Sequence, residues 1–206
     1  MIKNIIFDFD GVILDSVPVK TEAFKKLFAS FDNSSVDKLI AYHLQNGGKS
    51  RYLKIEYFFK EVLNKHISEN EILEYADKYS SLTKEELSKS KYLIKDTVSF
   101  IQKNFQNYNL HVASGADEKD LKYICESLDL NRYFLSVHGS PIPKDDLIKD
   151  ILVNNKYLTE ETILIGDSIN DFTAAEKNHI VFYGYNNTLL KEDHNYIDHF
   201  DFIGLV

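Results

Sequence analysis

The sequence contains few of the features that mark secreted, membrane or nucleic-acid-binding proteins. Its single cysteine, Cys125, excludes an intrachain disulfide and favours a reducing compartment. No apolar run approaches the roughly 18 residues of a membrane span, and the first residues resemble a strand, not a signal peptide. The net charge of −8 argues against general nucleic-acid binding, which needs a basic surface. We therefore expect a cytoplasmic protein that binds neither nucleic acid nor membranes, with a monomer as the default.

Proline is also rare, so the three prolines do not mark domain boundaries. Short apolar, β-branched runs alternate with helical patterns, and this alternation is typical of βαβ units in a parallel sheet. The predicted strands cover residues 3–7, 110–113, 134–137, 162–165 and 180–183. The predicted helices between them cover residues 95–104, 117–128, 144–154 and 170–177. We therefore predict an α/β fold with helices on both faces of a parallel sheet.

Residues 18–88 depart from this alternation because they contain helical patterns and no convincing strand. Pro18 suits the first turn of a helix, and residues 51–63 and 69–79 continue the helical spacing. One apolar stripe is predicted to form the core of this segment: Tyr52, Ile55, Phe58, Phe59 and Val62. We predict a helical cap domain at residues 16–88, inserted into a core formed by residues 1–15 and 89–206.

Acidic residues follow two of the predicted strands. Asp8 and Asp10 follow the first strand, in Asp8-Phe9-Asp10-Gly11, and Asp167 and Asp171 follow the fourth. Ligands of open parallel sheets bind at the carboxyl ends of the strands, so these side chains converge if the two strands are neighbours. Several carboxylates in a small space need a counter-charge. Mg²⁺ is the expected cofactor because it takes oxygen ligands and also binds phosphate.

Two other strand ends offer groups that bind phosphate. Ser114 and Gly115 follow the second strand and present a hydroxyl and backbone N–H groups. Lys144 begins a helix after the third strand, and its ammonium could neutralise a phosphate. Taken singly, each of these features is more typical of a turn, a helix cap or a solvated lysine. Their occurrence at four successive strand ends predicts a phosphoryl-transfer site.

Together these segments resemble the four motifs of the haloacid dehalogenase superfamily. The motifs are Asp8-Phe9-Asp10-Gly11-Val12, Ser114, Lys144 and Gly166-Asp167-x3-Asp171. The resemblance spans nearly the whole chain and is greatest to the branch of phosphoglycolate phosphatases and β-phosphoglucomutases, which carry a helical cap at this place. It implies a Rossmann-like, three-layer core with strand order 3-2-1-4-5.

The resemblance also implies a role for each motif residue. Asp8 is expected to be the nucleophile that forms an aspartyl phosphate, Asp10 the general acid and base, and Lys144 a further catalytic residue. The expected metal ligands are Asp8, Asp10, Asp167 and Asp171. The residues expected to contact the phosphoryl group are Gly11, Ser114, Gly115 and Lys144. Because dehalogenating members lack the second aspartate and the metal, Asp10 favours a phosphatase.

A turn within the cap, Gly47-Gly48-Lys49-Ser50-Arg51, is a candidate substrate contact. It is not a nucleotide-binding P-loop, because that motif needs a glycine where this chain has His43. Its Gly-x-Ser-Arg pattern resembles the cap loop through which β-phosphoglucomutases contact their substrate. We therefore expect Gly48, Ser50 and Arg51 to bind substrate, with sugar phosphates as the favoured class. A solvated helix start is the alternative interpretation.

We expect a magnesium-dependent phosphatase that hydrolyses a small phosphorylated metabolite. A β-phosphoglucomutase-like mutase is the alternative, and a non-catalytic domain that binds a phosphorylated ligand is a remote one. The mutase is disfavoured because mutase-like members carry a histidine where this chain has Lys20. His194 and His199 have no strong metal-binding spacing, so we expect them at the surface.

Overall fold

The computed structural model describes residues 1–200, which contain a six-stranded sheet with every strand parallel to its neighbours. The strands are β1 (Asn4–Phe7), β2 (Asn109–Asp117), β3 (Ser136–Ser140), β4 (Thr162–Gly166), β5 (Val181–Tyr185) and β6 (Tyr196–Ile197). Their order is β3-β2-β1-β4-β5-β6. The predicted order of the first five strands is therefore confirmed, and β6 adds a short edge strand that was not predicted.

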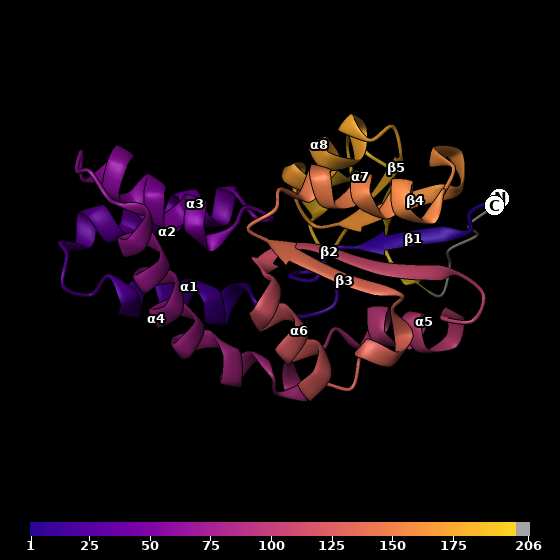
Figure 1. Ribbon diagram of the computed structural model, residues 1–206, viewed down its shortest axis with the longest axis horizontal. Helices are drawn as coiled ribbons and strands as arrows, with labels where there is room; N and C mark the ends of the chain where they lie inside the picture. The colour runs from indigo at the N-terminus through magenta and orange to yellow at the C-terminus, as the bar shows by residue number, and fades with distance from the viewer. Residues whose placement is uncertain (201–206) are drawn as a thin grey trace.

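Helices cover both faces of the sheet (Figure 1). They are α5 (Lys95–Asn104) and α6 (Glu118–Ser127) on one face, and α7 (Lys144–Asn155) and α8 (Ile169–Lys177) on the other. Successive side chains of a strand point to opposite faces. Accordingly, Ile5 belongs to the buried cluster that contains Phe100 of α5, whereas Ile6 belongs to the one that contains Ile148 of α7. The predicted three-layer α/β fold is confirmed.

Two strands, β2 and β3, differ most from their predicted bounds. β2 extends to Asp117, and its pairing with β3 shifts between Ala113 and Asp117. Ser114 and Gly115 therefore lie within an irregular part of β2 and not in a loop after it. β3 begins at Ser136, and Phe134, at which the apolar run starts, lies ahead of the strand and is buried in the core.

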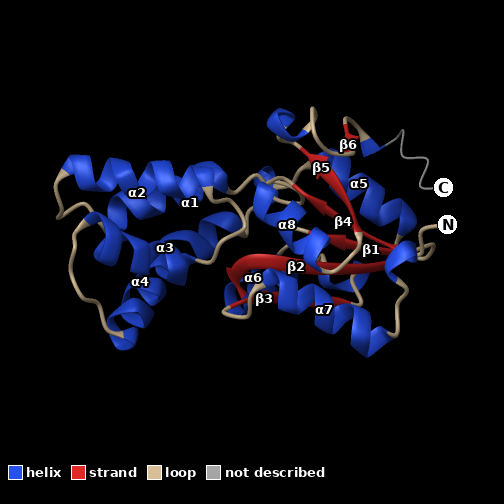
Figure 2. Ribbon diagram, turned by 90° about the horizontal axis from the view of Figure 1, so that it is seen from above, coloured by secondary structure: helices blue, strands red, loops and turns tan. Residues whose placement is uncertain are grey.

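A helical unit lies beyond the carboxyl ends of the strands (Figures 1 and 2). Its helices are α1 (Val17–Leu27), α2 (Asn33–Gln45), α3 (Arg51–Tyr57), a π-helix (Phe58–Val62) and α4 (Glu69–Leu87). They share a buried cluster that contains Ile55 and Phe58, with Tyr52, Phe59 and Val62 packed against it, as predicted. We call residues 17–87 the cap and the rest of the described chain the core. The predicted boundaries at residues 16 and 88 stay a prediction.

Polar side chains cap the N-termini of α3 and α6. Ser50 begins α3 and accepts a hydrogen bond from Leu53 N at 3.4 Å. Asp117 begins α6 and accepts from Asp120 N at 3.1 Å. These side chains bind N–H groups that the first helical turn leaves without partners.

Within residues 1–200, no helix is both long and apolar enough to cross a membrane.

Candidate active site

Asp8 lies at the carboxyl end of the central strand β1. β4 pairs with β1 on one side, and Asp8 N donates to Ile165 O at 2.8 Å. One carboxylate oxygen of Asp8, Oδ1, accepts from Phe9 N at 2.7 Å and lies 2.8 Å from Lys144 Nζ. The other oxygen, Oδ2, is buried and has no hydrogen-bond partner among residues 1–200. A buried polar atom without a partner is costly, so Oδ2 is a position for a bound ligand.

Lys144, the first residue of α7, joins Asp8 to Asp171. Its buried ammonium pairs with Asp8 Oδ1 and with Asp171 Oδ1. Burial by itself would lower the pKa of Lys144, but the carboxylates of Asp171 and Asp8 raise it above its ordinary value. Asp171 Oδ2 accepts from N and Oγ of Ser168, at 3.0 and 2.7 Å. Both oxygens of Asp171 therefore already have protein partners.

Asp8, Asp167 and Asp171 form a cluster in which one oxygen of each lies within 4.8 Å of the others. Burial, with the neighbouring acidic groups, raises the pKa of Asp8 to about 7 and that of Asp167 to about 8. A divalent cation would relieve this repulsion. Among residues 1–200 the Asp167 carboxylate has no hydrogen bond or ion pair, which leaves it free to bind one. These oxygen donors fit Mg²⁺.

Gly11 provides the space for the Asp167 carboxylate. Its φ is +77°, a conformation that favours glycine, and a Cβ at this position would lie 1.9 Å from Asp167 Oδ2. Any larger residue would therefore displace Asp167. The predicted contact of Gly11 with a phosphoryl group stays a prediction.

Asp10 contacts a residue of the cap. Its Oδ1 accepts from Ser16 Oγ at 2.5 Å, and its Oδ2 accepts from Lys20 Nζ at 2.5 Å. Burial opposes ionisation of Asp10, but the charge and hydrogen bond of Lys20, with the Ser16 hydroxyl, lower its pKa. These contacts therefore favour the ionised form of Asp10. The sequence identified Lys20 only as a departure from the mutase pattern, whereas the structure places it against a predicted catalytic residue.

The cap loop lies directly against the core. Asn170 Nδ2 donates to Gly47 O at 2.6 Å. A Cβ on Gly115 would lie 1.9 Å from Gly48 O, so the two backbones approach more closely than another residue would permit. Ser114 is buried beside this contact, and its Oγ accepts from Ala116 N at 3.1 Å. The structure therefore brings Gly48, Ser114 and Gly115 together with the cap closed.

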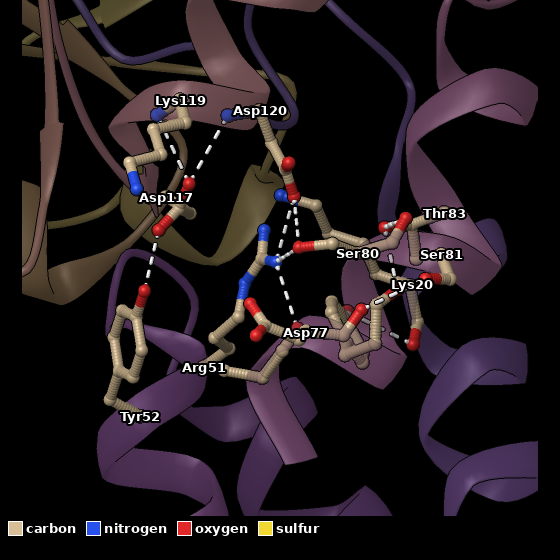
Figure 3. A network of polar contacts seen from close by, with 12 residues as sticks. Lys20, Arg51, Tyr52, Asp77, Ser80, Ser81, Thr83, Asp117, Lys119 and Asp120 are labelled. Carbon is tan, nitrogen blue, oxygen red and sulfur yellow. Dashed lines mark hydrogen bonds and ion pairs between the residues drawn. The ribbon is translucent and has the colours of Figure 1, made fainter. Parts of the chain in front are cut away.

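Arg51 points toward α6 of the core (Figure 3). Its Nη1 lies 2.7 Å from Asp120 Oδ2, and it also donates to Ser80 Oγ and to Ala76 O. The side chains of Arg51 and Asp120 are only 6% and 9% exposed, so this ion pair is buried. Substrate binding by Arg51 stays a prediction, and in this structure its Nη1 atom pairs with Asp120.

The neighbours of Arg51 in the sequence also have structural partners. Tyr52 donates its hydroxyl proton to Asp117 Oδ2 at 2.5 Å (Figure 3). Ser50 caps α3, which agrees with the alternative interpretation of the loop as a helix start. Arg51 and Tyr52 together connect the cap to the beginning of α6, a connection that the sequence pattern did not indicate.

A small cavity lies between the cap and the core. The core contributes Asp10 and Asp167 to its lining, and the cap contributes five basic side chains: Lys20, His43, Lys49, Arg51 and Lys54. His43 and Lys54 were not predicted as site residues. The sequence offered one indication for Lys54. It lies among the apolar residues of the stripe, where a lysine that faces solvent is not expected.

The two C-terminal histidines lie elsewhere. His199 is exposed, as predicted, whereas His194 is half-buried and its ring lies 4.1 Å from that of Phe172. Neither belongs to the carboxylate cluster of the described residues.

A Rossmann-like sheet with carboxylates and a lysine at its central strand ends, covered by a helical cap, defines a class of capped hydrolases. The chain belongs to the haloacid dehalogenase-like hydrolase family, whose sequence model matches residues 5–185. The predicted family is therefore confirmed. The prediction that the chain is an enzyme of the phosphatase class is confirmed at the level of this family.

Individual relatives agree with this assignment. A phosphoglycolate phosphatase of Photobacterium profundum is 26% identical over 201 residues, covering 90% of this chain and 85% of the relative. The solved structure of a β-phosphoglucomutase from Clostridium difficile is 18% identical and superposes with a TM-score of 0.78, covering 100% of this chain and 94% of that one. A predicted phosphoglycolate phosphatase from Haemophilus somnus is 17% identical, with a TM-score of 0.73 and coverage of 97% and 95%. At these identities the structural likeness shows the fold.

Proposed function

We propose that this protein is a Mg²⁺-dependent phosphatase that hydrolyses a small phosphorylated metabolite through an aspartyl phosphate on Asp8. The observation that supports this most strongly is the asymmetry of the Asp8 carboxylate. Lys144 binds one oxygen at 2.8 Å, while the other is buried without a partner among the described residues. An oriented carboxylate with one free oxygen is suited to attack an electrophile.

The cation site follows from the free oxygens of the cluster. Asp8, Asp167 and the backbone carbonyl of Asp10 would hold Mg²⁺, with Asp171 in support because both of its oxygens already bind Ser168 or Lys144. When bound, the cation would neutralise charge on the phosphoryl oxygens and on Asp8. Lys144 and Ser114 would bind the remaining phosphoryl oxygens and stabilise the charge of the transition state.

Asp8 and Asp10 divide the chemistry between them. In the first step a carboxylate oxygen of Asp8 forms a bond to phosphorus, the bond from phosphorus to the alcohol oxygen breaks, and Asp10 protonates that oxygen. In the second step Asp10 accepts a proton from water, which attacks phosphorus and releases inorganic phosphate from Asp8. The first step starts from protonated Asp10 and the second from ionised Asp10. Lys20 and Ser16 favour the ionised form, which is the form that the second step needs.

Release of phosphate from p-nitrophenyl phosphate tests this function. We expect turnover with Mg²⁺, loss of turnover with EDTA, and recovery when Mg²⁺ is restored. Asp8→Asn should lower kcat by roughly a thousandfold or more, because it removes the nucleophile, and should leave the circular dichroism spectrum unchanged. Near-normal phosphatase activity of Asp8→Asn would show that the proposed mechanism is wrong.

Sugar phosphates are the substrate class that we favour, from the resemblance of the Gly48–Arg51 loop. A screen of phosphorylated metabolites with Mg²⁺ would identify the substrate. With a labelled hexose phosphate, inorganic phosphate is the expected product, and an isomeric sugar phosphate would instead favour the mutase. Cytoplasmic location and a monomeric state remain part of this proposal.

A further inference from the structure

We propose that Lys54 and His43 of the cap form a binding site for a second anionic group, a carboxylate or a second phosphate, on the alcohol part of the substrate. The identity of this ligand as a substrate rests on the proposed phosphatase function. The site itself rests on the geometry of the cap cavity. A phosphoester without a second anionic group would leave this site unused.

Lys54 is a buried amine without an ion-pair partner among the described residues, and burial lowers its pKa to about 7. Its residue is 5% exposed, it lines the cavity between the cap and the core, and it forms no ion pair among residues 1–200. The buried cations Lys144 and Arg51 are each paired with a carboxylate. A buried charge without a partner is costly, which is why burial disfavours the charged form of Lys54. An anionic ligand in the cavity would supply the missing partner.

His43 completes the site with a second donor. Lys54 Nζ lies 3.0 Å from His43 Nδ1. The charged form of Lys54 can only donate hydrogen bonds, so with this form Nδ1 accepts and the proton of the neutral imidazole resides on Nε2. Burial lowers the pKa of His43 to about 3, which keeps the ring neutral. Its Nε2 is buried and has no hydrogen-bond partner among the described residues.

The position of the pair relative to the catalytic residues indicates which part of the substrate it would bind. The same cavity is lined by Asp10 and Asp167 of the core, so a ligand group in it would lie between these carboxylates and the cap. Lys20 already pairs with Asp10. Lys54 is therefore the buried lysine of the described cap that has no ion-pair partner. A phosphoryl group at Asp8 therefore places the alcohol part, and any anionic group on it, in the cap cavity near Lys54.

The test measures the binding of non-hydrolysable ligands to the full chain with Mg²⁺, by calorimetry. The ligand 3-phosphonopropionate carries a carboxylate, 3-hydroxypropylphosphonate has a neutral hydroxyl in its place, and 1,3-propanediphosphonate carries a second phosphonate. We expect the wild type to prefer at least one anionic ligand over the hydroxyl compound by roughly 10- to 100-fold, as for a hydrogen-bonded charge pair. Tighter binding of 3-phosphonopropionate would identify the second anionic group as a carboxylate, and tighter binding of 1,3-propanediphosphonate would identify it as a phosphate.

Variants of Lys54 assign the preference to this residue. Lys54→Met should abolish the preference while the affinity for 3-hydroxypropylphosphonate stays within about threefold, and Lys54→Arg should retain part of it. Lys60→Met, which removes an exposed cap lysine paired with Glu56, is the matched control and should leave the preference intact. Lys54→Met should also raise the melting temperature without ligand, since it removes a buried amine that has no ion-pair partner among the described residues.

Three results would overturn the proposal: no preference in the wild type, a preference that survives in Lys54→Met, or an equal loss of affinity for all three ligands. The last would mean that Lys54 binds the phosphoryl group or supports the fold. Because binding is measured without turnover, this outcome is separate from the proposed function. If the preference depends on Lys54 but no phosphoester is hydrolysed, the phosphatase proposal fails and the anion site stands.

Discussion

Arg51 Nη1 in the cap lies 2.7 Å from Asp120 Oδ2 in the core, and both side chains are buried. The adjacent Tyr52 donates to Asp117, the residue that begins the same core helix, α6 (Figure 3). Two consecutive cap residues thus hold the cap on one helix terminus. The same cap helix, α3, also carries Lys54, so we expect these contacts to support the closed cap.

Asp120→Asn should weaken cap closure. It removes the counter-charge of Arg51, and an open cap allows the guanidinium to regain water. We expect KM for a small phosphoester to rise roughly tenfold with kcat changed by less than about threefold. Lys122→Met, which removes an exposed pair with Glu118 on the same helix, is the control. Unchanged KM in Asp120→Asn, together with unchanged hydrogen exchange of residues 46–52, would contradict this role.

Lys144→Met should impair both catalysis and stability. Asp8 and Asp171 would lose their shared cation, so their repulsion would grow. We expect kcat to fall by roughly 100- to 1,000-fold, the usual effect of losing one group that stabilises the transition state. In EDTA the melting temperature of Lys144→Met should be lower than that of the wild type. Added Mg²⁺ should raise it by more than it raises that of the wild type. Lys149→Met, on the exposed side of α7, should resemble the wild type, and the prediction fails if both variants behave alike.

Gly11→Ala should reduce the affinity for Mg²⁺. The new Cβ would lie 1.9 Å from Asp167 Oδ2, and the φ of +77° disfavours alanine. Gly47→Ala is a milder change, since its Cβ would lie 3.3 Å from the nearest atom, in Ser168. Calorimetric titration with Mg²⁺ should show at least roughly tenfold weaker binding for Gly11→Ala than for Gly47→Ala, because a displaced ligand costs binding energy. Equal affinities would show that Asp167 does not bind the cation.

Stability should decrease in mild acid because of His111. This residue is buried in β2, between Ser136 Oγ at 2.8 Å and Tyr157 OH at 3.1 Å, and burial lowers its pKa to about 4. Between pH 6.5 and 4 the unfolded chain binds a proton here and the folded chain does not. The contribution of His111 is therefore complete above pH 6.5 and is lost as the pH falls, by up to about 1.4 kcal/mol per pH unit.

Urea unfolding at pH 7.5, 6 and 5 measures this dependence. His111→Gln should be less stable at every pH because it alters two buried hydrogen bonds, but its stability should depend less on pH than that of the wild type. His199→Gln, which changes an exposed ring, should keep the dependence of the wild type. An unchanged dependence in His111→Gln would assign the effect to other groups, such as His43.

The core was predictable because its signals are local. β1 is a short apolar run that ends at Asp8, and the motifs at the other strand ends are separated by recognisable strands and helices. The irregular part of β2 was not predictable, since a shift in register depends on the partner strand β3 and leaves no mark in the pattern of residues 114–117. Ser114 was therefore expected in a loop.

The cap was predictable as helical, but its contacts were not. His43 and Lys54 are 11 residues apart on two helices, and only the packing of α2 against α3 brings their side chains together. Likewise the partner of Arg51 is on α6 of the core, and no local pattern links the two positions. The sequence reveals which cap residues are polar, whereas the folded structure decides whether they face solvent, the core or the cavity.

The central claim is that Asp8 carries the phosphoryl group between the two steps, and chemical trapping tests it most directly. The protein is mixed with p-nitrophenyl phosphate and Mg²⁺, quenched with acid within one turnover, and reduced with borohydride, which converts an aspartyl phosphate to homoserine. Mass spectrometry of the peptide that contains residue 8 should show homoserine in the wild type and none in Asp8→Asn. Inorganic phosphate released without any modification of Asp8, or homoserine at position 10 instead, would contradict the account.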